Sequence, residues 1–176
     1  KAIIYNNGDI ILIDTVEKNK IIKKTILLPV TVELRTISAY QHDKRIKYYT
    51  VEKKPVDMHT DEGKIINDSR YLITFPDLIQ NNPLKLVYSI HGVSWKPRLD
   101  IEITNEKIVN IYMNAVIPVG KNQIKDCNIS LIYSHSSNKV STEEDRYDIG
   151  KINLLQYQTV NYILKSTETS YTNYLK

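Results

Sequence analysis

Cysteine, glycine and phenylalanine are scarce in this chain. Of its 176 residues, one is Cys, five are Gly and one is Phe. The single thiol, Cys127, excludes an internal disulfide framework, which fits either a reducing compartment or a surface protein that needs no cross-links. An apolar run of the roughly 18 residues that a membrane-spanning helix requires is also missing. We therefore expect no membrane span.

The motifs of common catalytic chemistry are missing as well. The sequence has no glycine-rich phosphate loop, no Gly-x-Ser-x-Gly elbow and no Cys with a nearby His. Asp57, His59 and Asp61 form its one local group of metal-ligand types, and without ligands from elsewhere such a group is more typical of a polar turn. We expect no enzyme activity, no metal and no cofactor.

Charge does not select a partner. The net charge is +4, and the lysines are spread along the chain instead of forming a block. Hydrophobic residues make up 41% and charged residues 25%, as in ordinary globular proteins that bury a core. Disorder is therefore not expected.

Short segments rich in β-branched and aromatic residues follow one another along the chain, separated by turn signals such as Asn6-Asn7-Gly8 and Asn81-Asn82-Pro83. They include residues 10–16, 24–37, 45–52 and 70–75. A two-residue alternation of apolar residues predicts one strand face of Leu84, Leu86, Tyr88 and Ile90, and the pattern repeats at Leu99, Ile101 and Ile103. No stretch keeps a helical period over about twelve residues. The pattern predicts an all-β fold, an antiparallel β-sandwich of two packed sheets with little or no helix.

Domain organisation follows from the same pattern. We expect residues 1–176 to form a single β-sandwich domain, or an excerpt of a larger protein, since the chain begins at Lys1 and not at Met. The polar run at residues 134–148 predicts an exposed loop.

The stretch "VYSIHGVSWKPRLDIEI", residues 87–103, holds the only Trp. Pro97 cannot donate to a sheet, so a strand should end or bulge before it, and Gly92 permits a conformation or a close approach that a side chain would block. Trp95 can then close one end of the core with its indole N–H on a backbone carbonyl. We interpret Gly92, Trp95 and Pro97 as a structural corner, with ligand stacking on Trp95 as the alternative.

The same region resembles a known family. "LKLVYSIHGVSWKPRLDIEI" and the following "NAVIPVGKNQIKDCNISLIYS" are similar over residues 84–134 to the signature of the DUF4139 family, the C-terminal domain of proteins similar to mucoidy inhibitor A. Leu99 stands where that family usually has Tyr, and residues 119–123 depart from its Thr-Gly-Glu-Asp-Trp turn, as in a divergent member. The resemblance implies a β-sandwich without established catalytic residues.

Two further features suggest surfaces. Arg45, Lys47 and Tyr49 would line one strand face as a weak basic and aromatic surface, although charged residues also protect sheet edges from pairing. The uncharged run at residues 152–164 either pairs within a sheet or forms a protein contact, with Tyr157 and Tyr162 as anchors.

The expected function is therefore that of a non-enzymatic interaction or assembly module in a larger envelope, secreted or viral structural protein. Its partner would be a protein, self-association included, since 13 Tyr suit half-exposed faces and interfaces. A domain that binds carbohydrate or single-stranded nucleic acid is the alternative. Nucleic acid is the less expected of the two ligands, because Asp43 and Glu52 dilute the positive charge around Arg45 and Lys47. The compartment is not determined by the sequence.

Overall fold

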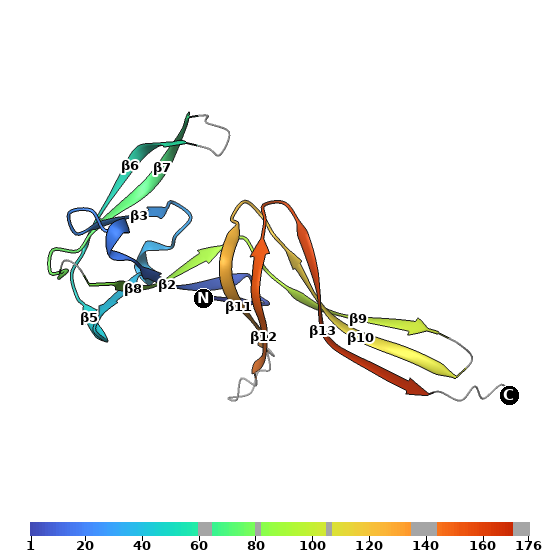
Figure 1. Ribbon diagram of the computed structural model, residues 1–176. Coiled ribbons are helices and arrows are strands. Elements are labelled where there is room, and N and C mark those ends of the chain that lie inside the picture. Colours follow the sequence, from blue (N-terminus) through green and yellow to red (C-terminus); the bar gives the residue numbers. More distant parts are fainter. Residues whose placement is uncertain (60–64, 80–81, 105–106, 135–143, 171–176) are drawn as a thin grey trace. The chain divides into compact units, whose positions relative to one another are not determined.

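The structure is a computed structural model that describes residues 1–59, 65–79, 82–104, 107–134 and 144–170, with side chains except at 56–59 and 65–68. In this part of the chain the secondary structure is almost entirely β (Figure 1). The exceptions are two single turns of 3₁₀-helix, Lys18–Lys20 and Leu34–Thr36. The predicted all-β class, with antiparallel sheets packed on one another and little helix, is confirmed.

The strands range from three residues in β5 to twelve in β13, so several are longer than the short segments that the sequence pattern predicted. Their bounds are β1 (Ala2–Tyr5), β2 (Asp9–Val16), β3 (Thr25–Pro29), β4 (Ser38–Gln41), β5 (Lys44–Ile46), β6 (Thr50–His59), β7 (Ile65–Thr74), β8 (Leu84–His91), β9 (Lys96–Ile103), β10 (Ile108–Pro118), β11 (Ile124–Ser134), β12 (Glu144–Leu154) and β13 (Thr159–Ser170).

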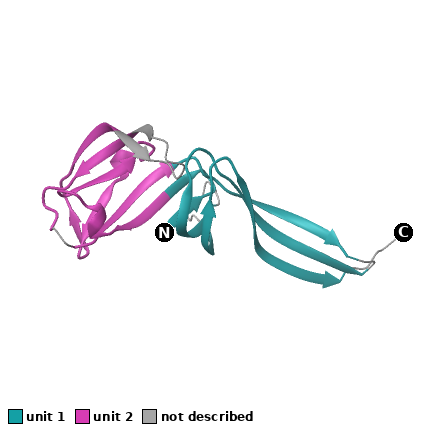
Figure 2. Ribbon diagram, turned by 45° about the horizontal axis from the view of Figure 1, so that its top comes forward, with its two compact units in different colours: residues 1–10, 91–176 teal, residues 11–90 magenta. Residues whose placement is uncertain are grey.

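The chain divides into two compact units (Figure 2). Unit 1 contains residues Lys1–Ile10 and His91–Lys176, and unit 2 contains Ile11–Ile90. Unit 1 is therefore built from both ends of the sequence, with unit 2 inserted between them. The single domain expected for residues 1–176 stays a prediction beside this division.

Unit 1 contains two groups of paired strands. In the first, β1 lies parallel to β11, which pairs antiparallel with β12. In the second, β10 lies between β9 and β13, and both pairings are antiparallel. The parallel pair places Ile4 opposite Leu131, and both side chains are fully buried. Because a parallel neighbour cannot be reached through a tight turn, this pair depends on the return of the chain after unit 2.

Unit 2 has β8 between β2 and β4, with β5 beyond β4, and a second sheet in the order β3-β7-β6. The predicted alternation of β8 is confirmed, because its apolar positions Leu84, Leu86, Tyr88 and Ile90 are all buried. Phe75, in the same unit, is also completely buried. The β4–β5 hairpin turns at His42 and Asp43, which both have positive φ, as a tight two-residue turn requires.

Three predicted segments need correction. Strand β3 ends at Pro29, so residues 24–37 are not one strand, because proline has no N–H for the ladder. Residues 45–52 are likewise interrupted between Ile46 and Thr50. β12 begins at Glu144, so the last part of the loop expected at 134–148 is strand paired with β11, while residues 135–143 lie outside the described part.

Candidate interaction surface

The corner around Trp95 lies in the core of unit 1. The indole is completely buried, and its Nε1–H donates to the backbone oxygen of Ile132 at 3.0 Å. Tyr133 and Tyr147 meet it edge-on, with ring centroids 5.8 Å away in both cases. The polar atom of the indole is thus satisfied and its rings are enclosed by aromatic neighbours. No face of Trp95 is open for stacking on a ligand.

Two glycines permit a close backbone crossing beside this corner. Gly92 has φ of +110°, a conformation that L side chains rarely adopt. The N–H of Gly120 donates to the backbone oxygen of Gly92 at 2.8 Å. A Cβ added at Gly120 would lie 2.8 Å from that same oxygen, which is too close for real atoms. The crossing fixes Gly92 against the turn after β10, within unit 1.

Beyond the corner, strand β10 carries one apolar face along its whole length. Val109, Ile111, Met113, Ala115 and Ile117 alternate along the strand and therefore share a face. Ala115 and Ile117 are completely buried, whereas the other three are half-buried. The same face of β10 is therefore part of the buried core at one end of the strand and partly exposed to solvent at the other.

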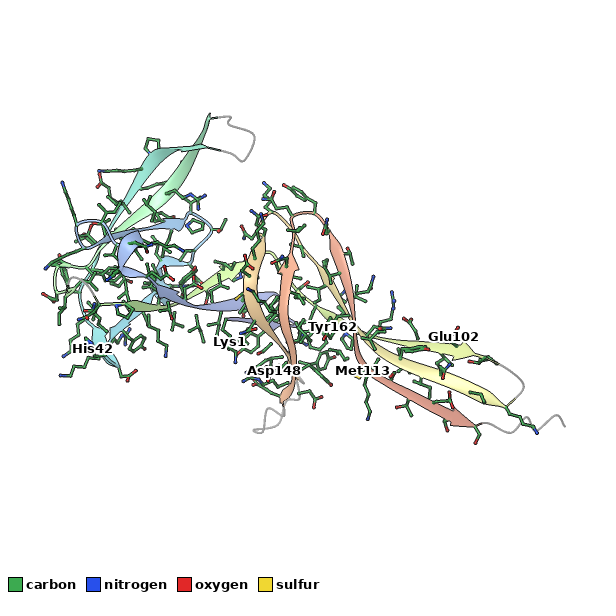
Figure 3. All side chains as sticks on the ribbon, in the orientation of Figure 1. Lys1, His42, Glu102, Met113, Asp148 and Tyr162 are labelled. Carbon is green, nitrogen blue, oxygen red and sulfur yellow. The ribbon has the colours of Figure 1, made fainter. Side chains whose placement is uncertain are left out.

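Strand β9 widens this partly covered end. Leu99, Ile101 and Ile103 lie directly opposite Met113, Ile111 and Val109, so they share the same face of the sheet. The exposed fractions of Leu99, Ile101 and Ile103 are 61%, 61% and 66%. We refer to these six residues of β9 and β10 as the exposed aliphatic face (Figure 3 labels Met113). Exposed contiguous apolar patches on soluble proteins commonly mark interaction sites.

A β-bulge limits the aliphatic face on the side of β13. The register between β10 and β13 shifts after Met113, which pairs with Lys165, whereas Asn114 pairs with Ile163. Past this point the β13 residues opposite Met113, Ile111 and Val109 are Lys165, Thr167 and Thr169. The face is thus bordered by polar side chains along β13 and ends at β9 on the other side.

On the opposite face of β9 and β10, polar side chains are hydrogen-bonded to one another. Asp100 accepts from Arg98 at 2.8 Å and from Asn114 Nδ2 at 2.6 Å. Tyr112 donates its hydroxyl to Glu102 at 3.2 Å. Desolvation, with the hydrogen bond and the negative charge of Glu102, raises the pKa of Tyr112 above its ordinary value. The β9–β10 part of the sheet is therefore amphipathic: the side chains of one face are hydrogen-bonded to one another, and those of the other face are aliphatic and partly exposed.

The anchors predicted in residues 152–164 lie at the far edge of this sheet and in the turn before it. Tyr157 lies between β12 and β13, is 72% exposed and has φ of +57°. Its N–H donates to Gly120 O at 3.2 Å. Tyr162 is half-buried on β13 opposite Ala115 (Figure 3). The run thus pairs within sheets through β12 and β13.

The predicted basic and aromatic face is wrong as a single strand face. Arg45 is on β5, but the strand ends at Ile46, so Lys47 and Tyr49 follow it without strand geometry. The Tyr49 hydroxyl donates to Leu34 O at 3.2 Å, and its ring packs on Phe75 with centroids 5.7 Å apart. Tyr49 therefore packs within unit 2, although the alternation of a strand would have placed its ring on the exposed face.

The Asp57, His59 and Asp61 group lies outside the residues with described side chains. Elsewhere in the described residues no group of three His, Cys, Asp or Glu side chains is placed to hold a metal. Asp148 has its pKa lowered by the Ser130 hydroxyl and by Arg146, against a smaller opposing effect of desolvation. This carboxylate takes part in a local hydrogen-bonded group.

Unit 2 contains a cavity of about 740 Å³. Its lining is mostly aliphatic, and includes buried Ile26, Leu28 and Leu86 with exposed Ile22 and Leu27. The one aromatic side chain in the lining, Tyr88, already donates its hydroxyl to Asp14 at 2.5 Å. This cavity was not predictable from the sequence, because its walls include strands whose residue pattern is that of ordinary core strands.

The exposed aliphatic face was not predicted from the sequence either. The strict alternation of charged and aliphatic residues in "KPRLDIEI" was a signal for an amphipathic strand, but it is equally typical of a strand with a covered face. Among the described residues, no helix is long and apolar enough to cross a membrane. Comparison with protein family models, curated proteins and solved structures finds no match to this chain.

Proposed function

We propose that this protein is a non-enzymatic interaction module that binds another protein chain through the sheet β13-β10-β9 of unit 1. The observation that carries the proposal is the exposed aliphatic face, where Leu99, Ile101 and Ile103 are each more than half exposed. Burying such side chains contributes about 25 cal/mol per Å² of apolar surface, so a partner that covers them gains binding free energy.

The form of the sheet supports a protein partner more than a carbohydrate. Carbohydrate or single-stranded nucleic acid would be expected to stack on exposed aromatic rings, whereas this face is aliphatic and Trp95 is enclosed. An edge strand additionally offers backbone hydrogen bonds, which recognise another strand. We extend the proposal to an assembly role within a larger envelope, secreted or viral structural protein.

Site-specific photocrosslinking tests this function in the cell that makes the protein. A photoreactive side chain at Ile101 should give a defined crosslinked protein, identified by mass spectrometry, because that position lies in the aliphatic face. The same group at Tyr48, which is 57% exposed in unit 2, is the matched control and should not give that product. The product should also disappear when Leu99 and Ile103 are replaced by Thr. Identical products from both positions, or none from Ile101, would refute the proposed surface.

The cavity of unit 2 favours a second candidate function, the binding of a small apolar molecule. Its volume lies within the range of about 300–1,000 Å³ that is usual for ligand sites. An apolar fluorescent dye should bind the parent and lose affinity in Ile22→Glu and Leu27→Glu, which change exposed wall residues and should leave the fold intact. Unchanged dye affinity in both variants would count against this function. Thr substitutions in the aliphatic face of unit 1 control for dye bound there.

A further inference from the structure

The direction of the backbone groups of β9 follows from one hydrogen bond. The N–H of Thr104, directly after β9, donates to Ile108 O at 3.0 Å, so residue 104 faces β10. In an antiparallel ladder, alternate residues direct both N–H and C=O to the same side. Leu99, Ile101 and Ile103 therefore direct theirs away from β10, toward the edge of the sheet. Pro97 has the same parity, so its missing N–H costs no bond to β10.

The charges of β9 are divided along the strand. Its two basic residues, Lys96 and Arg98, come first, and its two acidic residues, Asp100 and Glu102, come last. These even-numbered positions share the polar face, while Leu99, Ile101 and Ile103 share the other. A strand with a basic first half and an acidic second half is complementary to itself when two copies run in opposite directions.

One register satisfies all four charges. If Leu99 lies opposite Leu99 of a second copy, then Lys96 lies opposite Glu102 and Arg98 opposite Asp100, each twice because of the two-fold symmetry. A shift of the symmetry point to Asp100 places the two Asp100 residues opposite each other, and a shift to Ile101 places Asp100 opposite Glu102. A shift to Arg98 places the two arginines opposite each other. Opposite charges across strands stabilise pairing, and like charges oppose it.

The same register also fits the backbone and the aliphatic side chains. Leu99 lies among the residues whose N–H and C=O point to the edge, so the two copies of Leu99 can exchange both hydrogen bonds. The N–H of Ile101 can donate to the C=O of Pro97 in the other copy. Pro97 is the acceptor in this hydrogen bond, so its missing N–H does not matter for it. Leu99 packs beside Leu99, and Ile101 beside Pro97.

We infer that the partner of this surface is a second copy of the chain, bound through antiparallel pairing of β9 with β9 across a two-fold axis at Leu99. The two sheets then form one continuous sheet in which the aliphatic faces of both copies lie on the same side. This inference rests on the proposed function, for which it names the partner. The paired region is short, so the dimer belongs to the weak, concentration-dependent class.

Charge exchange on β9 tests the inference. An acidic-edge variant carries Lys96→Glu and Arg98→Glu, and a basic-edge variant carries Asp100→Lys and Glu102→Lys. Each variant alone brings like charges together at all four pairs, so its dimerisation constant should fall by about tenfold or more. An equimolar mixture restores four opposite-charge pairs and should form a heterodimer at least as readily as the parent forms its dimer.

The readout is solution mass by sedimentation over a wide concentration range. The mass of the parent should rise toward that of a dimer, each variant should remain a monomer, and the mixture should again reach the dimer. Lys165→Glu with Glu168→Lys alters charges on β13, at the other edge of the same sheet, and should leave dimerisation unchanged. Far-ultraviolet circular dichroism and the fluorescence of buried Trp95 check that every variant is folded.

Three results would overturn the inference: a parent that stays monomeric, variants that dimerise like the parent, or a mixture that does not recover. The photocrosslink at Ile101 separates this failure from that of the proposed function. A product that contains two copies of this chain supports the inference, whereas a product with a different protein overturns it and leaves the proposed function standing. Absence of any product from Ile101 contradicts both.

Discussion

The two ends of strand β10 carry similar side chains on one face and meet different surroundings. Near Pro118, Ala115 and Ile117 are completely buried, whereas near Ile108 the residues of the same face are half-buried and their neighbours on β9 are exposed. The residue types do not change between the two ends, so hydrophobicity alone does not decide burial. What differs is whether other strands of unit 1 cover that part of the sheet.

The largest change in the free energy of unfolding should come from a substitution in the buried core of unit 1. Trp95→Ala should lower the free energy of unfolding by about 3–5 kcal/mol, the range for truncating a packed aromatic side chain. The loss has two causes, the space left between Tyr133 and Tyr147 and the loss of the indole hydrogen bond to Ile132 O, which keeps only the N–H of Asn6 as a donor. Denaturant unfolding measures it.

Trp95→Phe sharpens the first test. It keeps an aromatic ring but removes the donor to Ile132 O, so its effect should lie between that of the parent and that of Trp95→Ala. A Trp95→Ala variant that unfolds at the parent's denaturant concentration would show that the corner does not support the core.

The same substitution at the two ends of the aliphatic face tests the comparison directly. Ile117→Thr places a hydroxyl in a fully buried site and removes apolar volume, so it should lower the free energy of unfolding by about 2 kcal/mol or more. Ile101→Thr keeps a β-branched residue at an exposed strand position and should change it by only about 0.5 kcal/mol or less. Both are measured by denaturant unfolding at low protein concentration. Equal costs would remove the contrast between the two ends.

A smaller effect is expected at the backbone crossing beside the corner. Gly120→Ala should destabilise the fold by about 1–3 kcal/mol, because its Cβ would meet Gly92 O at 2.8 Å and one backbone segment must shift. Lys121→Ala is the control in the same turn, since its side chain is exposed, and it should have little effect. Thermal unfolding compares the two. Equal melting temperatures would mean that the crossing adapts without strain.

The smallest expected effect is on the ionisation of one side chain, the carboxyl group of Asp148. The Ser130 hydroxyl is the main cause that lowers the pKa of Asp148 below its ordinary value of 3.8, so Ser130→Ala should raise that pKa. Because the pKa in the folded protein is the lower one, the carboxylate stabilises the fold above the unfolded pKa and loses this effect as the pH falls through the folded pKa. Ser130→Ala should therefore make this contribution smaller, and its loss should be complete at a higher pH.

Nuclear magnetic resonance titration of the Asp148 carboxyl carbon measures this change. Ser166→Ala, a substitution of the same kind at an exposed position of β13, is the control and should not move the titration. A titration of Asp148 that is the same in Ser130→Ala as in the parent would mean that Arg146 and other charges lower the pKa without the serine.

Much of the fold was predictable from local pattern. The alternation of β8 identified Leu84, Leu86, Tyr88 and Ile90 as one face, and that face is buried. Pro97 also lies on a strand at the edge of its sheet, where its missing N–H is tolerated. These features depend on the residue itself or on its near neighbours, so the sequence contains the information.

Other features depended on segments far apart in the sequence. Leu99, Ile101 and Ile103 repeat the alternation of β8 and yet are exposed, because alternation identifies a common face but not what covers it. The strand expected around Tyr49 ends at Ile46, and the Tyr49 ring packs on Phe75 from another part of unit 2. The resemblance of residues 84–134 to the DUF4139 family stays a prediction.

The sequence by itself determined that this chain is built of strands, that β9 is amphipathic and that its charges change sign halfway along. These properties follow from β-branched content, proline and a two-residue period, which are local. Tertiary structure alone decided that β1 pairs with β11, although all of unit 2 lies between them in the sequence. It also decided that the apolar face of β10 is fully buried at one end and half-buried at the other. Burial requires a second surface, and the position of that surface depends on long-range strand pairing that a local pattern cannot specify.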